Sequence, residues 1–243
     1  MSRNLFVGEL EDDVMCDVLN ICRNQFPDIS GWQEPAAGEP GYDVAKSFED
    51  TVHIVYDRER SHWVTVVIPQ VLKGSATVFV YDSLQRTDGV SHNLTDSLQC
   101  KIAQMCNESG PTIHVVYPAC QQQANGDKKS CGYFAIANAL EFCPTKKIRF
   151  QFFQTKVFSQ HLQAYLQKKK LTAFPKDRQS FKSPGKVSRK EVIQVYCECR
   201  MPQCYDIKAV ECELCSEWFH FKCVGLKSSP GSWVCGRHSD HSD

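Results

Sequence analysis

The chain has 243 residues, of which 42% are hydrophobic and 23% are charged, and its formal net charge is zero. This length predicts one ordinary domain and a second, small one. No apolar run approaches the roughly 20 residues that a membrane span needs. The N-terminal sequence MSRNLFVGELEDDV lacks the apolar core of a secretory signal. We therefore expect an intracellular protein that is not secreted and has no membrane partner.

Cysteine and charge are distributed unevenly along the chain. Seven of the 14 cysteines crowd together between Cys197 and Cys235. Basic residues number 14 against 19 acidic ones in residues 1–167, 9 against 1 in residues 168–190, and 5 against 8 in residues 191–243. In a reducing compartment, cysteines are more often metal ligands, nucleophiles or buried thiols than disulfides. The chain therefore divides into an acidic domain, a basic connection and an acidic cysteine-rich module.

The predicted secondary structure is mixed. Helical periodicity and strands rich in β-branched and aromatic residues alternate along the first two-thirds of the chain. Helices are expected at residues 12–26, 95–106 and 158–170 and directly after Cys131, and strands at residues 51–56, 63–68, 76–81 and 112–117. This order predicts an α+β fold.

A polar, basic stretch broken by Pro and Gly follows these elements. Its sequence LTAFPKDRQSFKSPGKVSRK is typical of a linker. We assign residues 1–167 to the first domain, 168–192 to the linker and 193–243 to the cysteine-rich module. The composition of the linker fits a solvated tether as well as a nuclear-import or nucleic-acid-contacting segment.

The segment QQQANGDKKSCGYFAIANALEF contains the strongest candidate for a nucleophile. Cys131 lies where a polar loop runs into an apolar helical pattern. The N–H groups and the dipole of a helix N-terminus favour a thiolate over a thiol. A small core cysteine that begins a helix is the alternative interpretation, and the choice depends on residues elsewhere in the chain.

Two strand ends supply the partners that a nucleophilic cysteine needs. His62 begins the strand HWVTVV, and Asp82 directly follows the strand ATVFVY. Neighbouring antiparallel strands bring such ends together, so that Asp82 orients His62 and His62 takes the proton of Cys131. Gln123, in the loop before Cys131, has an amide that can donate to an oxyanion. These residues predict a thiol protease site.

The pattern HW…YDSL…QQANG…SCGYF resembles the ubiquitin-like-protein (SUMO) protease family, in a form close to protease-like domains of mobile elements. The resemblance covers about two-thirds of the chain. It implies a papain-like cysteine protease fold of the adenovirus-protease and SUMO-protease type, and activity on SUMO, NEDD8, ubiquitin or a related protein. It also implies that His62 is the base, Asp82 its orienter, Cys131 the nucleophile and Gln123 the oxyanion donor. Trp63 would form one wall of a narrow tunnel for a Gly-Gly tail.

The chain departs from this family at three points. Ser130 replaces the acidic residue that usually precedes the nucleophile. The loop between the glutamine and the cysteine is two residues longer, so Gln122 or Gln121 is an alternative to Gln123. Glu9-Leu10 stands where the family has a Trp-Leu pair. The alternative function is a protease-like domain that is weak or inactive and serves as a chromatin or protein interaction module.

The C-terminal cysteines have the spacing of a metal-binding module, C-x-C-x12-C-x2-C-x4-H-x2-C-x11-C-x2-H. Eight ligands suffice for two tetrahedral zinc sites, and a module of some 45 residues requires such cross-links to fold. Trp233 and the C-x-C start favour a PHD finger over a RING-like module, to which the spacing is also similar.

The resemblance to PHD fingers implies a cross-brace of two zinc ions. One ion would be held by Cys197, Cys199, His220 and Cys223, and the other by Cys212, Cys215, Cys235 and His238, with His241 as a substitute for the last. Cys204 is left over as a spare thiol. Many PHD fingers hold a methyl-lysine of a histone tail in an aromatic cage, and by this resemblance Tyr196 and Trp218 match two cage walls, with Tyr205 as a third. A histone H3 tail and a nuclear location are therefore expected. A purely structural or protein-docking finger is the alternative interpretation.

Overall fold

The computed structural model describes residues 9–39, 42–46, 50–69, 76–86, 92–106, 110–177, 189–204 and 207–237. The expected helices and strands form at or close to their expected positions. The expected elements are α1 (Asp12–Gln25), β1 (Thr51–Asp57), β2 (His62–Ile68), β3 (Ala76–Tyr81), α2 (Asp96–Met105), β4 (Thr112–Tyr117), α3 (Cys131–Phe142) and α4 (Phe158–Lys168). The structure adds η1 (Thr155–Val157), β5 (Arg189–Gln194), β6 (Ala209–Glu211) and β7 (Trp218–His220). The structure is therefore of mixed α and β type.

The larger sheet has the strand order β1-β2-β3-β4-β5. Strands β1, β2 and β3 are antiparallel neighbours, β3 and β4 are parallel, and β5 runs antiparallel to β4. The pairing of β2 with β3 brings Thr65 opposite Tyr81. This register places the first residues of β2 at the same end of the sheet as the residue that follows β3, and the candidate catalytic site lies at this end.

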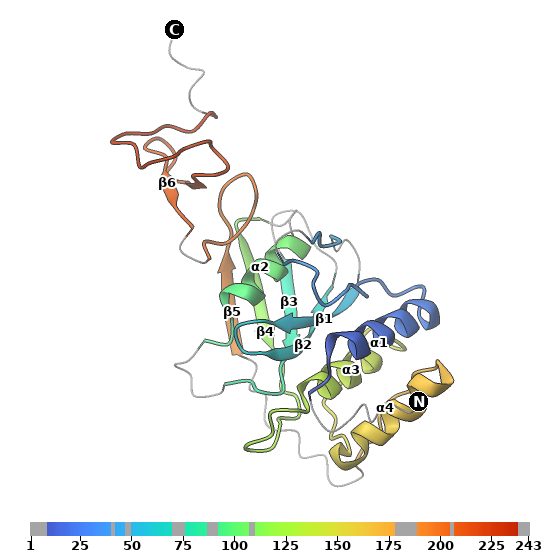
Figure 1. Cartoon of the computed structure of the whole chain (residues 1–243). Coiled ribbons are helices and arrows are strands. Elements are labelled where there is room, and N and C mark those ends of the chain that lie inside the picture. The colour runs from blue at the N-terminus through green and yellow to red at the C-terminus, as the bar shows by residue number, and fades with distance from the viewer. Residues whose placement is uncertain are drawn as a thin grey trace.

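Helices cover both faces of the sheet (Figure 1). Alternate residues of a strand point to opposite faces, and the two faces build separate cores. In β1, Ile54 belongs to the core formed with α1, α3 and α4, whereas Val55 belongs to the core formed with α2. The sequence of α3 is apolar all round and lacks the polar face of a surface helix, which fits its almost complete burial.

The predicted linker differs from the observed structure at both ends. Leu171 and Phe174 are buried in the core with α4, so the first domain extends past residue 167. Arg189–Gln194 forms β5, the edge strand of the sheet. The sequence of β5 does not have the apolar character of the other strands, because only alternate residues of this strand are buried. Ile193 is buried, whereas Val192 faces solvent beside basic residues. Most of the remaining linker, residues 178–188, lies outside the described residues.

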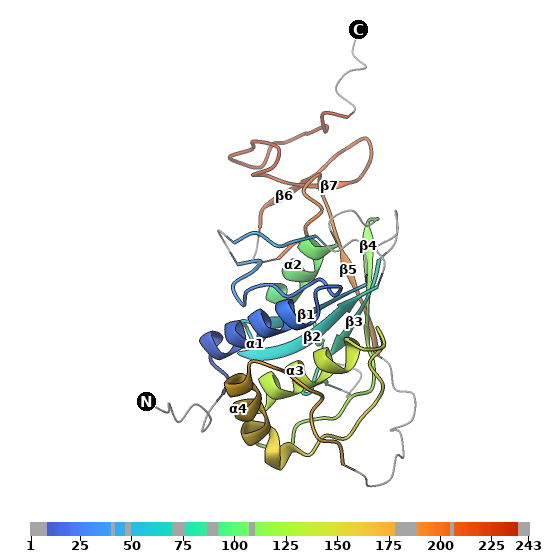
Figure 2. The same cartoon turned by 90° about the vertical axis from the view of Figure 1, so that its right-hand side faces the viewer.

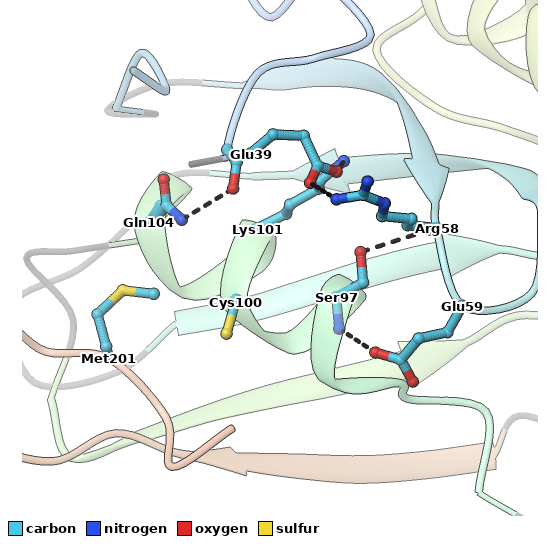
Figure 3. Close-up of a pocket in the computed structure, with 9 residues that line it drawn as sticks. Glu39, Arg58, Glu59, Ser97, Cys100, Lys101, Gln104 and Met201 are labelled. Carbon is cyan, nitrogen blue, oxygen red and sulfur yellow. Dashed lines mark hydrogen bonds and ion pairs between the residues drawn. The ribbon is translucent and has the colours of Figure 1, made fainter. Parts of the chain in front are cut away.

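The cysteine-rich module follows β5 directly and contains the two-stranded sheet of β6 and β7. Figure 1 and Figure 2 show it beyond the end of the first domain near α2, away from α4. Met201 packs against the core of the first domain that contains α2. Met201 and Cys100 of α2 also line one pocket of about 350 Å³ at this junction, as Figure 3 shows. The module therefore packs against the first domain through side chains.

Within the described residues, none of the helices has the length and apolar character that crossing a membrane requires.

Candidate functional site

His62 and Asp82 lie side by side at one end of the sheet. His62 is the first residue of β2 and Asp82 directly follows β3, and both side chains are almost completely buried. The Nε2 atom of His62 lies 2.7 Å from Oδ1 of Asp82. The same carboxylate oxygen accepts a hydrogen bond of 2.7 Å from the backbone N–H of Leu84. The carboxylate thus has a fixed position and fixes the imidazole in turn.

Arg60 is a third member of this cluster, and it was not among the expected site residues. Its Nη1 donates to Oδ2 of Asp82 at 2.7 Å, and its Nε donates to Oδ2 of Asp57 at 2.6 Å. Asp57 ends β1, three residues before Arg60. The sequence does contain a signal for this cluster. Asp57 and Arg60 are opposite charges three residues apart, and Arg60 lies two residues before the candidate base His62.

The charges of this cluster are coupled. Burial opposes the charged imidazole, but the interactions with Asp82 and Cys131 outweigh burial and raise the pKa of His62 to about 9. Burial likewise opposes the carboxylate, but the hydrogen bond from His62 and the charge of Arg60 lower the pKa of Asp82 to about 2. The pair is therefore an imidazolium and a carboxylate near neutral pH.

Cys131 begins α3 and contacts His62. Its side chain is buried and lies close enough to the imidazole to raise the pKa of His62. Because Nε2 of His62 is bonded to Asp82, Nδ1 is the nitrogen left for the thiol, and Nδ1 has no nitrogen or oxygen partner among the described residues. The chain therefore brings a thiol, an imidazole and a carboxylate into one row, the arrangement that nucleophilic catalysis by cysteine requires.

The N-terminal segment lies across the start of α3. A Cβ atom added to Gly132 would meet Cδ1 of Leu10 at 2.9 Å and Cβ of Leu10 at 3.0 Å. Glycine thus allows Leu10 to approach the helix next to Cys131. This close approach places Glu9-Leu10, one of the departures from the SUMO-protease pattern, beside the candidate nucleophile.

A pocket of about 470 Å³ opens beside Cys131. Trp63 is 3% exposed and lines it together with Tyr56, whose ring centroid lies 4.9 Å from that of Trp63. The remaining lining residues are Glu9, Leu10, Glu11, Asp12, Asp13 and Ser61. Trp63 therefore lines the pocket beside Cys131, and its role as a wall for an incoming chain stays a prediction.

The three consecutive glutamines are all hydrogen-bonded within the protein. Gln121 bonds to the backbone of Phe153, and the amide nitrogen of Gln122 donates to the carbonyl oxygens of Asp82 and Cys120. Gln123 accepts from the Ser83 hydroxyl at 2.8 Å through Oε1, and its Nε2 donates to the carbonyl of Asp127 at 2.8 Å. Gln123 therefore joins the segment after Asp82 to the loop before Cys131. Its role as oxyanion donor stays a prediction.

Asp127 organises the loop that leads to the nucleophile. Its Oδ1 accepts hydrogen bonds from the backbone N–H groups of Lys129 and Ser130, at 2.9 and 3.1 Å. Ser130 precedes α3 without a side-chain capping bond. The longer loop thus carries an acidic residue three positions before Ser130, and its carboxylate holds the main chain just ahead of Cys131. The sequence analysis did not assign a role to Asp127.

In the cysteine-rich module, predicted ligands gather in two clusters. Their ligand atoms lie within 4.8 Å of one another in each cluster. The clusters are Cys197, Cys199, His220 and Cys223, and Cys212, Cys215 and Cys235. The eighth predicted ligand, His238, and its substitute His241 lie outside the described residues.

The chemistry of both clusters fits zinc. The Cys215 and Cys235 sulfurs are 3.9 Å apart, close to the roughly 3.8 Å between two thiolates on a tetrahedral zinc ion with Zn–S bonds of about 2.3 Å. Nδ1 of His220 lies 3.2 Å from the Cys199 sulfur, and burial lowers the pKa of His220, which favours the neutral, ligating imidazole. The backbone N–H of Cys235 donates to the Cys212 sulfur at 3.3 Å. Zinc bound here would supply structural cross-links.

Two of the three predicted cage residues line one pocket. Tyr196 and Trp218 border a pocket of about 190 Å³ together with Glu217 of the module and Pro111 of the first domain. Trp218 is 40% exposed. The third predicted wall, Tyr205, lies outside the described residues. The pocket thus has two aromatic walls, one carboxylate from Glu217 and one guanidinium from Arg200.

Cys204 lies outside both described ligand clusters. Its side chain is buried and hydrogen-bonded to Cys100 of α2. The thiol that the spacing left over therefore contacts the first domain.

Known proteins resemble a short part of this chain. It is 52% identical over 47 residues to the chromatin remodeling protein SHL of Arabidopsis thaliana, covering 18% of this chain and 21% of that protein. It is 46% identical over 44 residues to the histone lysine demethylase PHF8 of Danio rerio, covering 17% of this chain and 4% of that protein. It is 36% identical over 55 residues to the chromatin remodeling protein EBS of Arabidopsis thaliana, covering 21% and 24%.

The matched region spans about a quarter or less of the length of each of these relatives. No protein-family model matches the chain. Together with the two ligand clusters, the similarity to these chromatin proteins supports a zinc-binding finger of the PHD type.

Proposed function

We propose that this chain is a nuclear, chromatin-directed protein whose finger is held by two zinc ions and binds a histone tail. The single observation that carries this proposal is the pocket shared by Tyr196 and Trp218. Aromatic faces attract a methylated ammonium group by about 0.5 to 2 kcal/mol for each well-placed ring. Glu217 and Arg200 line the same pocket with opposite charges, so the two aromatic rings supply the expected preference for the methylated group. The similarity to chromatin proteins supports the same partner.

A binding experiment with the full chain tests this proposal. Fluorescence polarisation compares histone H3 tail peptides that are unmethylated or trimethylated at single lysines. We expect one methylated peptide to bind more tightly than its unmethylated form, and Trp218→Ala to abolish this preference. Leu214→Ala is the matched control, because Leu214 is 65% exposed and does not line the pocket. Equal affinity of wild type and Trp218→Ala for every peptide would exclude the cage.

We propose as a second function that the first domain is a cysteine peptidase. Three observations support it: the 2.7 Å contact of His62 with Asp82, the buried position of Cys131 beside His62 at the start of α3, and the pocket beside the thiol. The Cys131 sulfur attacks a carbonyl carbon while its proton resides on the His62 imidazolium, and His62 then delivers that proton to the leaving amine. Asp82 holds the imidazole in place. Gln123 and a backbone N–H donate to the oxyanion.

The resemblance to SUMO proteases makes ubiquitin-like modifiers the first substrates to examine. Ubiquitin, SUMO and NEDD8 probes with C-terminal electrophiles are incubated with wild type and with Cys131→Ala, and adducts are detected by mass spectrometry. An adduct that depends on Cys131 is expected with one of them. If none forms one, the modifier-protease function is excluded, and the first domain is better described as an interaction module that accompanies the finger.

A further inference from the structure

The pocket beside Cys131 has an unusual charge for its size. Four of its nine lining residues are carboxylates, and none is Lys or Arg. All four acidic residues, Glu9, Glu11, Asp12 and Asp13, are exposed. Lys128 and Lys129 precede Cys131 in the sequence, but they do not line this pocket. The approach to the thiol from this side is therefore strongly negative.

Helix formation explains only part of this charge. Asp12 and Asp13 lie in the first turn of α1, where carboxylates favour the positive end of the helix dipole. Glu9 and Glu11 precede the helix, and the Glu11 side chain makes no capping hydrogen bond. Two of the four charges thus have no role in beginning α1, although they lie at the mouth of the same pocket.

The pocket also contains groups that point to a ligand. Cys131 and Trp63 line its buried end, and both are 3% exposed. His62 lies between two lining residues, Ser61 and Trp63, and is 1% exposed. Its Nδ1 is buried and has no hydrogen-bond partner among the described residues. Carboxylates at the mouth and a reactive pair at the buried end suit a chain that enters from solvent.

We propose that this pocket binds an extended peptide segment whose Lys or Arg side chains contact the four carboxylates while its main chain reaches Cys131. The proposal rests on the peptidase function proposed above, and it names the substrate class: a basic segment directly beside the bond that is cleaved. Leu10 and Trp63, which are both buried, line the pocket together with the thiol. The finger is proposed to bind a basic tail as well, so both sites would recognise the same chemistry.

Peptide binding tests the charge preference without requiring catalysis. Fluorescein-labelled peptides of sequence Lys-Lys-Gly-Gly, Ala-Ala-Gly-Gly and Glu-Glu-Gly-Gly are titrated against the full-length Cys131→Ala variant. The Lys peptide is expected to bind about ten-fold more tightly than the Glu peptide at low salt. The ratio should shrink at 0.15 M salt, where the Debye length is about 8 Å. Equal affinities at low salt would overturn the proposal.

Charge reversal assigns the preference to this pocket. Glu11→Lys/Asp12→Lys is expected to remove the preference for the Lys peptide or to invert it. Asp17→Lys/Asp28→Lys carries the same charge change on exposed residues that do not line the pocket, and it should keep the preference. The neutral variant Glu11→Gln/Asp12→Asn, with its melting temperature, separates charge from folding. If the charge reversal and its control behave alike, the pocket is not the binding site.

Covalent labelling tests the peptidase function separately. The same three peptides carry a C-terminal vinyl sulfone and are incubated with the wild-type chain. The Cys131 sulfur bonds to the terminal vinyl carbon, the π electron pair moves to the carbon beside the sulfone, and that carbon takes the proton that His62 received. Labelling at Cys131 that is about ten-fold faster for the Lys probe supports both proposals. Absence of labelling refutes the peptidase function alone, because the binding assay still decides the charge preference.

Discussion

Replacing Asp82 by Asn tests the charge state of the buried cluster. The substitution keeps an acceptor oxygen for the Leu84 N–H, but it removes the negative charge that both His62 and Arg60 contact. In the variant, burial remains and favours the neutral imidazole. We therefore expect the pKa of His62 to fall from about 9 to below its ordinary value of 6.5.

The magnitude follows from the same pKa. A rise from 6.5 to about 9 on folding corresponds to roughly 3 kcal/mol of stability. Because the folded pKa is the higher one, this stability is fully present below pH 6.5 and is lost as the pH rises through 9. The lowered pKa of Asp82 acts only below about pH 4. Asp82→Asn should therefore cost roughly 3 kcal/mol more at pH 6 than at pH 10.

Urea unfolding at both pH values, in buffers with zinc, measures this difference. Asp57→Asn is the matched control, because the side-chain bonds that the described structure gives the Asp57 carboxylate go to Arg60 and Thr95, whereas Asp57 and His62 are paired only as neighbours in β1 and β2. Its cost should be nearly the same at pH 6 and pH 10. Imidazole NMR signals of His62 give its titration midpoint directly, once in the wild-type chain and once in Asp82→Asn. An Asp82→Asn cost that is equal at both pH values would refute the imidazolium–carboxylate pair.

Three further predictions concern the loop before Cys131, the start of α3 and the metal sites. Asp127→Ala should slow Cys131 labelling by an electrophile, since it removes the acceptor of two backbone N–H groups, each worth about 1 kcal/mol; Asp127→Asn, which keeps an oxygen, should restore the rate. Gly132→Ala should cost about 1 to 3 kcal/mol by overpacking against Leu10, measured by thermal unfolding, and an unchanged stability would contradict the close approach. Elemental analysis should find two zinc ions per chain and one in Cys212→Ser, and chelation should shift the NMR signals of the finger while those of the sheet persist; a finger that stays folded without metal would contradict the assignment.

The zinc module was predictable because its ligands are close together in the sequence. Cysteine and histidine pairs separated by one to four residues leave few geometries other than metal binding. The structure brings seven of the eight predicted ligands into two clusters. The positions of His62 and Asp82 at strand ends were also readable, since a strand that alternates or is uniformly apolar shows its ends in the sequence.

Contacts between distant segments were decided only by the tertiary structure. Arg60 bonds to Asp82 because β2 and β3 pair in one particular register, which the sequence does not specify. Leu10 lies against Gly132 because α1 packs on the same face of the sheet as α3. The acidic mouth of the pocket exists only because the N-terminal segment crosses in front of Cys131.

The boundary between the two parts of the chain shows the same limit. Basic composition predicted a linker through residue 192, yet Arg189–Gln194 forms an edge strand. Alternate side chains of this strand face solvent, where charged residues are tolerated. The sequence by itself determined the zinc ligands and the ends of the strands, because these depend on local spacing and periodicity. The tertiary structure decided the partners of Asp82, the charge of the pocket and the packing of the finger on α2, because these depend on which distant side chains meet.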